Sequence, residues 1–208
     1  MKRYLLLLLL TFNALLAEAQ IPVLFFGGHE AAEFEFLWSK DIDQQGKFNL
    51  FNYTLFIADY NEKQENFSNI WQVITYNVNK TWGIAAGGAF SNGEFLPQIA
   101  LSYQVESNDL YVNLFPSVQY LPSEQTLGYA MFGLLFYQPK INDKWSAFSQ
   151  LLFEPLFSKD GHVSGFQQIR LGLNYQTLFQ FGVGINLTQT GNSFSNSTNV
   201  GLFLRKEL

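Results

Sequence analysis

Apolar side chains recur at every second position in segment after segment of this chain, with small or polar side chains between them. In a β-strand, alternate side chains point to opposite faces of the sheet. Ile99 and Leu101, for example, share one face of a predicted strand, whereas Ala100 lies on the other. The apolar face carries no charge in the middle of these segments. The pattern therefore predicts a closed sheet that is apolar outside and polar inside, which is typical of a transmembrane β-barrel.

The alternation predicts eleven strands, and the apolar run at 21–26 adds a twelfth. Because single-chain membrane barrels usually have an even number of strands, we expect an all-β fold, an antiparallel transmembrane β-barrel of 12 strands. Ten strands is the alternative, if the first strand or the 69–78 segment is misassigned. Apolar residues occupy both phases of 69–78, so the facing of that strand stays open. The other predicted strands are 33–40, 48–58, 81–90, 98–105, 110–119, 127–138, 144–157, 166–175, 179–188 and 197–208.

The connections between these strands fall into two alternating groups. Short turns are expected at 77–81, 106–109, 139–144 and 175–177, and longer polar loops at 59–68, 121–128, 158–165 and 190–199. Membrane barrels have short periplasmic turns and longer outer loops. The pattern therefore predicts that the short turns face the periplasm.

The start of the chain predicts a secretory signal peptide over residues 1–19, followed by one barrel domain over 20–208. Lys2 and Arg3 precede an apolar stretch, and Ala19 is a small residue that suits a cleavage site. A signal anchor is the alternative, but a membrane helix needs about 20 consecutive apolar residues, and this stretch is shorter.

Composition supports a membrane protein and excludes several chemistries. Charged residues make up 14% of the chain and aromatic residues 17%, with 22 Phe and 10 Tyr. Soluble domains usually carry about 25% charged residues, so a large area is expected to lie out of water. A formal net charge of −5 disfavours nucleic-acid binding. Without cysteine, the chain has neither disulfides nor thiolate metal sites. On the outward phase, the charges are Lys40 and Lys206, both at strand ends where their stems can extend toward headgroups.

The last predicted strand carries a resemblance to a known superfamily. Its alternating apolar positions are Val200, Leu202, Leu204 and Leu208, with Gly201 on the other phase. This pattern resembles the C-terminal strand of bacterial outer-membrane β-barrel proteins, and the Phe, Asn and Gln content is similar to that of small Bacteroidota-type barrels. The resemblance implies export through the periplasm, insertion by the barrel-assembly machinery and contact with outer-membrane lipid. The chain departs from the pattern in ending on leucine instead of an aromatic residue, and in Lys206.

Charged residues on the inward phase are the candidate functional groups of the lumen. The set is Glu35, Glu154, Arg170 and Arg205, with Glu33 beside it. If the 158–165 loop closes a hairpin centred near residue 162, Glu154 lies opposite Arg170 and the two side chains pair. Such a pair either forms a constriction that sorts solutes by charge or is a structural ion pair. No cofactor or metal site is predicted, since the two histidines, His29 and His162, lack metal-ligand spacing.

Three functional classes remain. The first is a small channel for small polar solutes, for which the inward Gly and amide residues are the support. The second is a closed barrel with a structural or surface-interaction role. The third is a lipid-modifying enzyme, with His162 and the serines near it as candidate groups. A soluble lipocalin-like carrier would need the reverse pattern, apolar inside and charged outside.

Overall fold

The computed structural model describes residues 22–60, 66–176 and 178–207. These residues form a closed antiparallel barrel of twelve strands, in which each strand pairs with its sequence neighbours and β1 pairs with β12. The predicted fold class and strand number are confirmed. The predicted signal peptide lies outside the described residues. The strands are β1 (Pro22–Gly28), β2 (Ala31–Asp41), β3 (Phe48–Asp59), β4 (Phe67–Asn77), β5 (Trp82–Ser91), β6 (Glu94–Glu106), β7 (Leu110–Leu121), β8 (Thr126–Tyr137), β9 (Trp145–Ser158), β10 (Gly161–Tyr175), β11 (Phe179–Thr190) and β12 (Ser195–Glu207).

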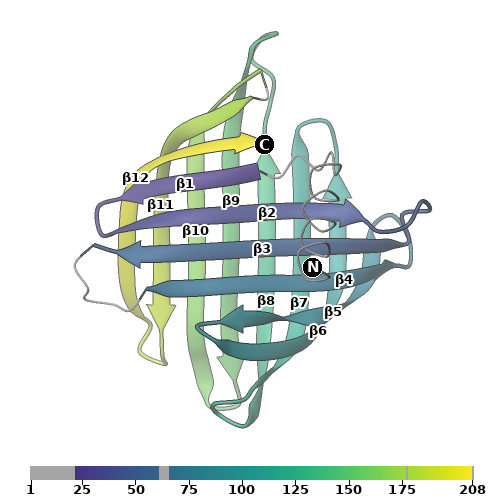
Figure 1. Cartoon of the computed structure of the whole chain (residues 1–208), viewed down its shortest axis with the longest axis vertical. Helices are drawn as coiled ribbons and strands as arrows, with labels where there is room; N and C mark the ends of the chain where they lie inside the picture. Colours follow the sequence, from purple (N-terminus) through teal and green to yellow (C-terminus); the bar gives the residue numbers. More distant parts are fainter. Residues whose placement is uncertain (1–21, 61–65, 177, 208) are drawn as a thin grey trace, which may run out of the picture.

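The view in Figure 1 looks through the wall formed by β1–β4 toward the opposite wall, and the strands of the two walls cross. We call the end of the barrel where β1 begins and β12 ends the terminal end, and the opposite end the far end. The terminal end carries the 42–47, 78–81, 107–109, 138–144 and 176–178 connections. No helix among the described residues is long and apolar enough to cross a membrane.

The outer surface of the barrel is an apolar belt. Ile99 and Leu202 are 65% and 67% exposed, whereas inward Ala100 and Phe203 are buried. The facing of β4 is also settled, because Trp71 and its alternate neighbours are buried while Ile70 and its alternate neighbours are exposed. The apolar belt is what a strand needs when lipid surrounds it, since a charge at mid-membrane costs about 2–4 kcal/mol.

The two predicted outward lysines lie on the exposed face near the terminal end. The Lys206 ammonium lies 5.5 Å from the centre of the Phe179 ring. Aromatic pairs on the outer face occupy the same end, with ring centres 4.8 Å apart for Trp82 and Tyr103 and 4.7 Å apart for Trp145 and Tyr175. Trp82 is exposed, and the other three rings are half-buried. Aromatic rings and long basic side chains suit the interface between lipid and water.

Three of the four expected long loops at the far end are wrong, whereas the loop expected at 59–68 corresponds to a seven-residue connection at 60–66. In the other three segments the strands continue, so that 159–160 is a two-residue connection and 122–125 and 191–194 have four residues. The connections at 29–30 and 92–93 also have two residues. At 92–93 the residues are Asn92 and Gly93, with φ of 47° and 85°, which is the backbone that a tight hairpin turn requires. Loop length therefore does not distinguish the two ends.

Proline in a β-sheet usually marks a bulge or the end of a strand. Pro116 and Pro155 instead lie inside strands β7 and β9. The β6–β7 ladder skips the pairs around Pro116, and the β8–β9 ladder skips those around Pro155, yet the register is the same on both sides of each gap. Proline has no N–H to donate, so the ladder is interrupted locally and the strand continues.

Candidate functional site

The interior of the barrel consists of two halves of opposite chemistry. We call the cluster of buried rings on β3, β4, β7 and β8 the aromatic half; its members are Phe51, Tyr53, Trp71, Phe115 and Phe132. We call the buried charged and amide side chains on β2 and β9–β12 the polar half; its members are Glu33, Glu35, Gln150, Gln168, Arg170, Asn186 and Arg205.

The aromatic half is packed ring against ring. Ring centres of Trp71 lie 4.6 Å from Phe132 and 5.3 Å from Phe115, and Phe51 lies 5.2 Å from Trp71. These are the separations of favourable tilted and edge-to-face aromatic pairs. Phe51 and Phe115 are only 1% and 2% exposed, so the rings fill this side of the lumen.

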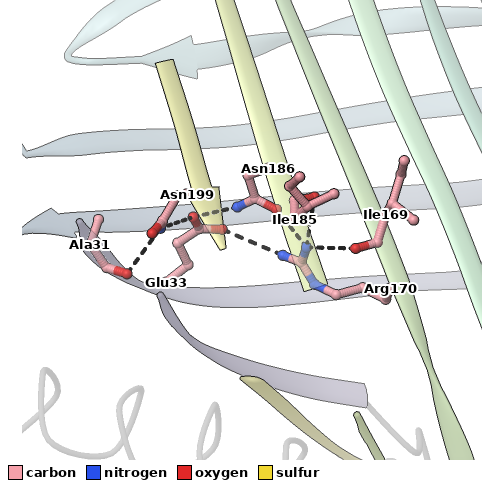
Figure 2. A network of polar contacts seen from close by, with 7 residues as sticks. All are labelled: Ala31, Glu33, Ile169, Arg170, Ile185, Asn186 and Asn199. Atoms are coloured by element: carbon pink, nitrogen blue, oxygen red, sulfur yellow. Dashed lines mark hydrogen bonds and ion pairs between the residues drawn. The ribbon is translucent and has the colours of Figure 1, made fainter. Parts of the chain in front are cut away.

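Arg170 organises the polar half and is completely buried. Its Nη2 lies 3.7 Å from Oε2 of Glu33, and its Nη1 donates hydrogen bonds to the Asn186 side-chain oxygen and to the carbonyls of Ile169 and Ile185 (Figure 2). The guanidinium also lies 4.1 Å from the centre of the Phe26 ring. A buried charge is tolerated when it is paired and hydrogen-bonded in this way.

Two amides fix the position of the Glu33 carboxylate. Asn199 donates to Oε1 of Glu33 at 3.3 Å and to the carbonyl of Ala31 at 3.0 Å. Asn186 donates to the same Oε1 (Figure 2). Gly184 makes room for this arrangement, because a Cβ on it would lie 2.7 Å from Cδ of Arg170. The ion pair thus joins β2 to β10 across β1, β12 and β11.

The predicted pairing of Glu154 with Arg170 is wrong. In the β9–β10 ladder Arg170 lies opposite Gln150, and Glu154 lies opposite Phe166. The hairpin turns at 159–160, two residues before the predicted centre, and the register shifts once between His162 and Ser164. A small change in the turn position therefore moved each residue to a different partner.

The other two candidate charges, Glu35 and Arg205, belong to the same half. The carboxylate of Glu35 is buried and lies within electrostatic range of both Arg170 and Arg205. Arg205 donates a hydrogen bond to the side-chain oxygen of Gln180, and its guanidinium lies 5.3 Å from the centre of the Phe136 ring. Three of the four candidate residues are thus brought together, and Glu154 is set apart from them.

Several buried polar atoms in the lumen have no hydrogen-bond partner among the described residues. They include Nε of Arg170 and Oε2 of Glu33. The amides of Gln150 and Gln168 are instead within hydrogen-bonding range of the Glu35 carboxylate. Native interiors pair nearly all such atoms, with protein or with ordered water. The polar half therefore offers hydrogen-bonding capacity that its own side chains do not use.

Glu154 belongs to a cavity of about 740 Å³ at the far end of the barrel, which we call the far-end cavity. Rings of Tyr53, Trp71 and Phe166 line one part of its wall. Its other lining residues are largely polar, and Glu33 connects it to the polar half. Two smaller cavities, of about 510 and 320 Å³, open at the terminal end.

The histidines are engaged in local structure. The His162 ring stacks on Phe194 with ring centres 4.3 Å apart, and its Nδ1 lies 2.9 Å from the Gly191 carbonyl oxygen. Nε2 of His29 lies 3.7 Å from Glu30. Among the described residues, no group of three or more His, Asp or Glu side chains is arranged to hold a metal ion.

Comparison with known proteins identifies the fold. No family model and no curated protein matches the chain. Among solved structures, a NanC porin matches with a TM-score of 0.54 and 11% identity, over 90% of this chain and 98% of that one. A KdgM porin matches with a TM-score of 0.50 and 13% identity, over the same shares of the two chains. The fold is that of an outer-membrane β-barrel.

Sequence reasoning identified only part of the aromatic half: it places Phe115 and Phe132 on the inward phase but misses Trp71 and Tyr53. Trp71 lies on a strand whose sequence is apolar on both phases, and Tyr53 lies on a strand that breaks the pattern of apolar outside and polar inside. On β3 the outward positions include Asn52 and Thr54, while the inward ones are Phe51, Tyr53 and Leu55. This reversed polarity over 51–55 is the signal that could have identified the cluster.

Proposed function

We propose that this protein is an integral barrel of the bacterial outer membrane, closed at mid-height, that acts at the cell surface in a structural or interaction role. The observation that carries the proposal is the filled middle of the lumen. Phe132 of the aromatic half is 3% exposed and Arg170 of the polar half is not exposed at all. Tyr53 of the aromatic half also lies within electrostatic range of Arg170. The closeness of side chains from the two halves supports a barrel without a wide bore.

The location rests on the outer surface and on the C-terminal strand. The apolar belt calls for lipid around the barrel, and the alternating pattern of β12 resembles the strand by which the barrel-assembly machinery receives its clients. We place the terminal end of the barrel on the periplasmic side of the membrane. The far-end cavity then opens to the outside of the cell.

A channel for small polar solutes is the second candidate. It is favoured by the unpartnered polar atoms of the polar half, which lie between the far-end cavity and the terminal end. Such atoms can pair with water or with a passing polar solute. Charge selection would then fall to Arg170 and the carboxylates around it.

Single-channel recording in planar bilayers distinguishes the two candidates. Folded protein, checked by heat-modifiable migration, is expected to insert without reproducible conductance steps. Combining Phe51→Ala with Phe132→Ala is expected to produce steps, because it removes two rings from the middle of the lumen. Leu202→Ala, on the lipid-facing surface, is the control and should stay silent.

Uniform steps from the unmodified protein would overturn the closed barrel and establish the channel. The ion preference of those steps should then be compared between the unmodified protein and Glu154→Gln. A shift in preference would place Glu154 in the solute path.

A further inference from the structure

The far-end cavity has an uneven charge. Its lining includes the carboxylates of Glu30, Glu33, Asp59 and Glu154, and no lysine, arginine or histidine among the described residues. Three of these acids have partners: Glu30 pairs with His29, Glu33 with Arg170, and Asp59 has an interaction of its own. Glu154 makes no hydrogen bond or ion pair with a described residue, so its charge is available to a ligand.

The surroundings of Glu154 are largely apolar. Phe166 is its partner in the ladder to β10, and its half-buried ring lines the cavity, as do Leu156 and Phe67. The phenol of Tyr53 is close enough to interact electrostatically with the carboxylate. A carboxylate beside aromatic faces is the combination that binds organic ammonium ions, since the face of a ring attracts a cation.

Hydrogen-bond donors without partners complete the wall. The Tyr53 hydroxyl, the Trp71 indole N–H and the Gln98 amide nitrogen are buried and pair with no described residue. All three residues line the cavity and are at most 8% exposed. Buried donors are seldom left unpaired, so they call for an acceptor oxygen on whatever fills the cavity.

We propose that the far-end cavity binds an organic cation, in which an ammonium group sits on an apolar body that also carries an acceptor oxygen. Glu154 is the counter-ion, Phe166 and its neighbours contact the ammonium, and the donors of Tyr53 and Gln98 face the oxygen. The volume of about 740 Å³ lies in the range of small-molecule sites. An anion would meet four carboxylates, and a bare calcium ion would need six to eight oxygen ligands, which one unpaired carboxylate does not supply.

Binding of acetylcholine to the full-length protein tests this proposal. Its uncharged isostere, 3,3-dimethylbutyl acetate, has the same shape and the same ester oxygens but no charge. Calorimetry in a polyoxyethylene detergent should give saturable binding of acetylcholine that is at least about tenfold tighter than binding of the isostere.

Glu154→Gln should weaken acetylcholine binding by about tenfold or more and leave the isostere unchanged, because only the charge is removed. Glu124→Gln is the matched control. Glu124 lies at the same end of the barrel, in the 122–125 turn and outside the cavity, so this variant should bind like the unmodified protein. Heat-modifiable migration shows that each variant is folded.

Equal affinity for the cation and its isostere, or an equal effect of the two glutamate substitutions, would overturn the proposal. So would tighter binding of an uncharged sugar such as methyl glucoside, which would assign the cavity to carbohydrate. Absence of acetylcholine binding to folded protein at millimolar concentration overturns it as well. Conductance is measured in a separate experiment. A negative binding result therefore contradicts the proposed cation site without bearing on the proposal that the barrel is closed.

Discussion

The aromatic half and the polar half fill the same lumen by different physics. Rings such as Phe51 and Phe132 are stabilised by packing alone, and their centres lie 5.7 Å apart. Arg170 and Glu33 need partners for every charge and N–H, and part of that need is unmet by the protein. The comparison teaches that the aromatic half is held mainly by ring packing. The opposite wall combines a second apolar cluster, of Leu24, Phe26, Phe148 and Phe203, with buried polar groups that are kept in place at a cost in stability.

The cost in stability comes from burying charged groups. Removing a charge from water is expensive, and a buried ion pair offsets the expense only when its remaining donors and acceptors are also satisfied. Nε and Nη2 of Arg170 lack hydrogen-bond partners among the described residues. An apolar replacement would serve packing as well, so the polar half is best explained by a role other than stability.

Loss of a ring from the aromatic half should have the largest effect on stability. Phe115→Ala is expected to lower the free energy of unfolding by about 3–5 kcal/mol, because it deletes contacts in a packed cluster and leaves a cavity. Urea titration of the heat-modifiable form measures this. Ile42→Ala, in an exposed turn at the terminal end, should change it by less than about 0.5 kcal/mol. A similar small change for Phe115→Ala would show that the aromatic half does not carry the packing.

Removing the central charge of the polar half should have the next largest effect. Arg170→Ala is expected to cost about 3 kcal/mol, at the lower end of the range for breaking a buried ion pair, because Glu33 also lines the far-end cavity and can be hydrated there. The exposed pair of Lys140 and Asp143 is the control, and Lys140→Ala should cost less than about 1 kcal/mol. Equal unfolding midpoints for the two variants would contradict the central position assigned to Arg170.

The smallest effect on stability is expected from removing the hydroxyl of Tyr53, which is a polar atom within the aromatic half. Tyr53→Phe removes a buried hydroxyl that has no partner among the described residues, so the free energy of unfolding should change by less than about 1 kcal/mol and can rise. The same urea titration measures it. A loss of several kcal/mol would mean that the hydroxyl is paired within the fold. Binding to the far-end cavity would then need another donor.

Much of the fold was predictable because strand alternation is a local signal. The twelve strands and the outward positions of Lys40 and Lys206 follow from a period of two along the chain. Three far-end turns, at 122–125, 159–160 and 191–194, were predicted too long because the polar ends of the flanking strands were interpreted as loops. Polar strand ends that extend beyond the membrane look like loops in sequence.

The candidate site was predictable only in part. Glu35, Arg170 and Arg205 could be placed in the lumen by their phase, but the partner of Arg170 could not be chosen. Glu33 lies 137 positions earlier in the chain, and the two meet because closure of the barrel sets β2 near β10. The pairing with Glu154 failed because it depended on the turn centre, and an error of two residues there exchanges partners.

The sequence by itself determined the architecture of this protein: a closed antiparallel β-barrel, and the apolar outward face of its strands except for 69–78, whose facing stayed open. Those properties depend on neighbours two positions apart, so they can be inferred without knowing how the sheet closes. Only the tertiary structure decided that rings from four strands fill one half of the lumen and that Glu154 stands apart in the far-end cavity. Contacts across a barrel depend on closure, strand tilt and register together, and no local pattern in the chain encodes that combination.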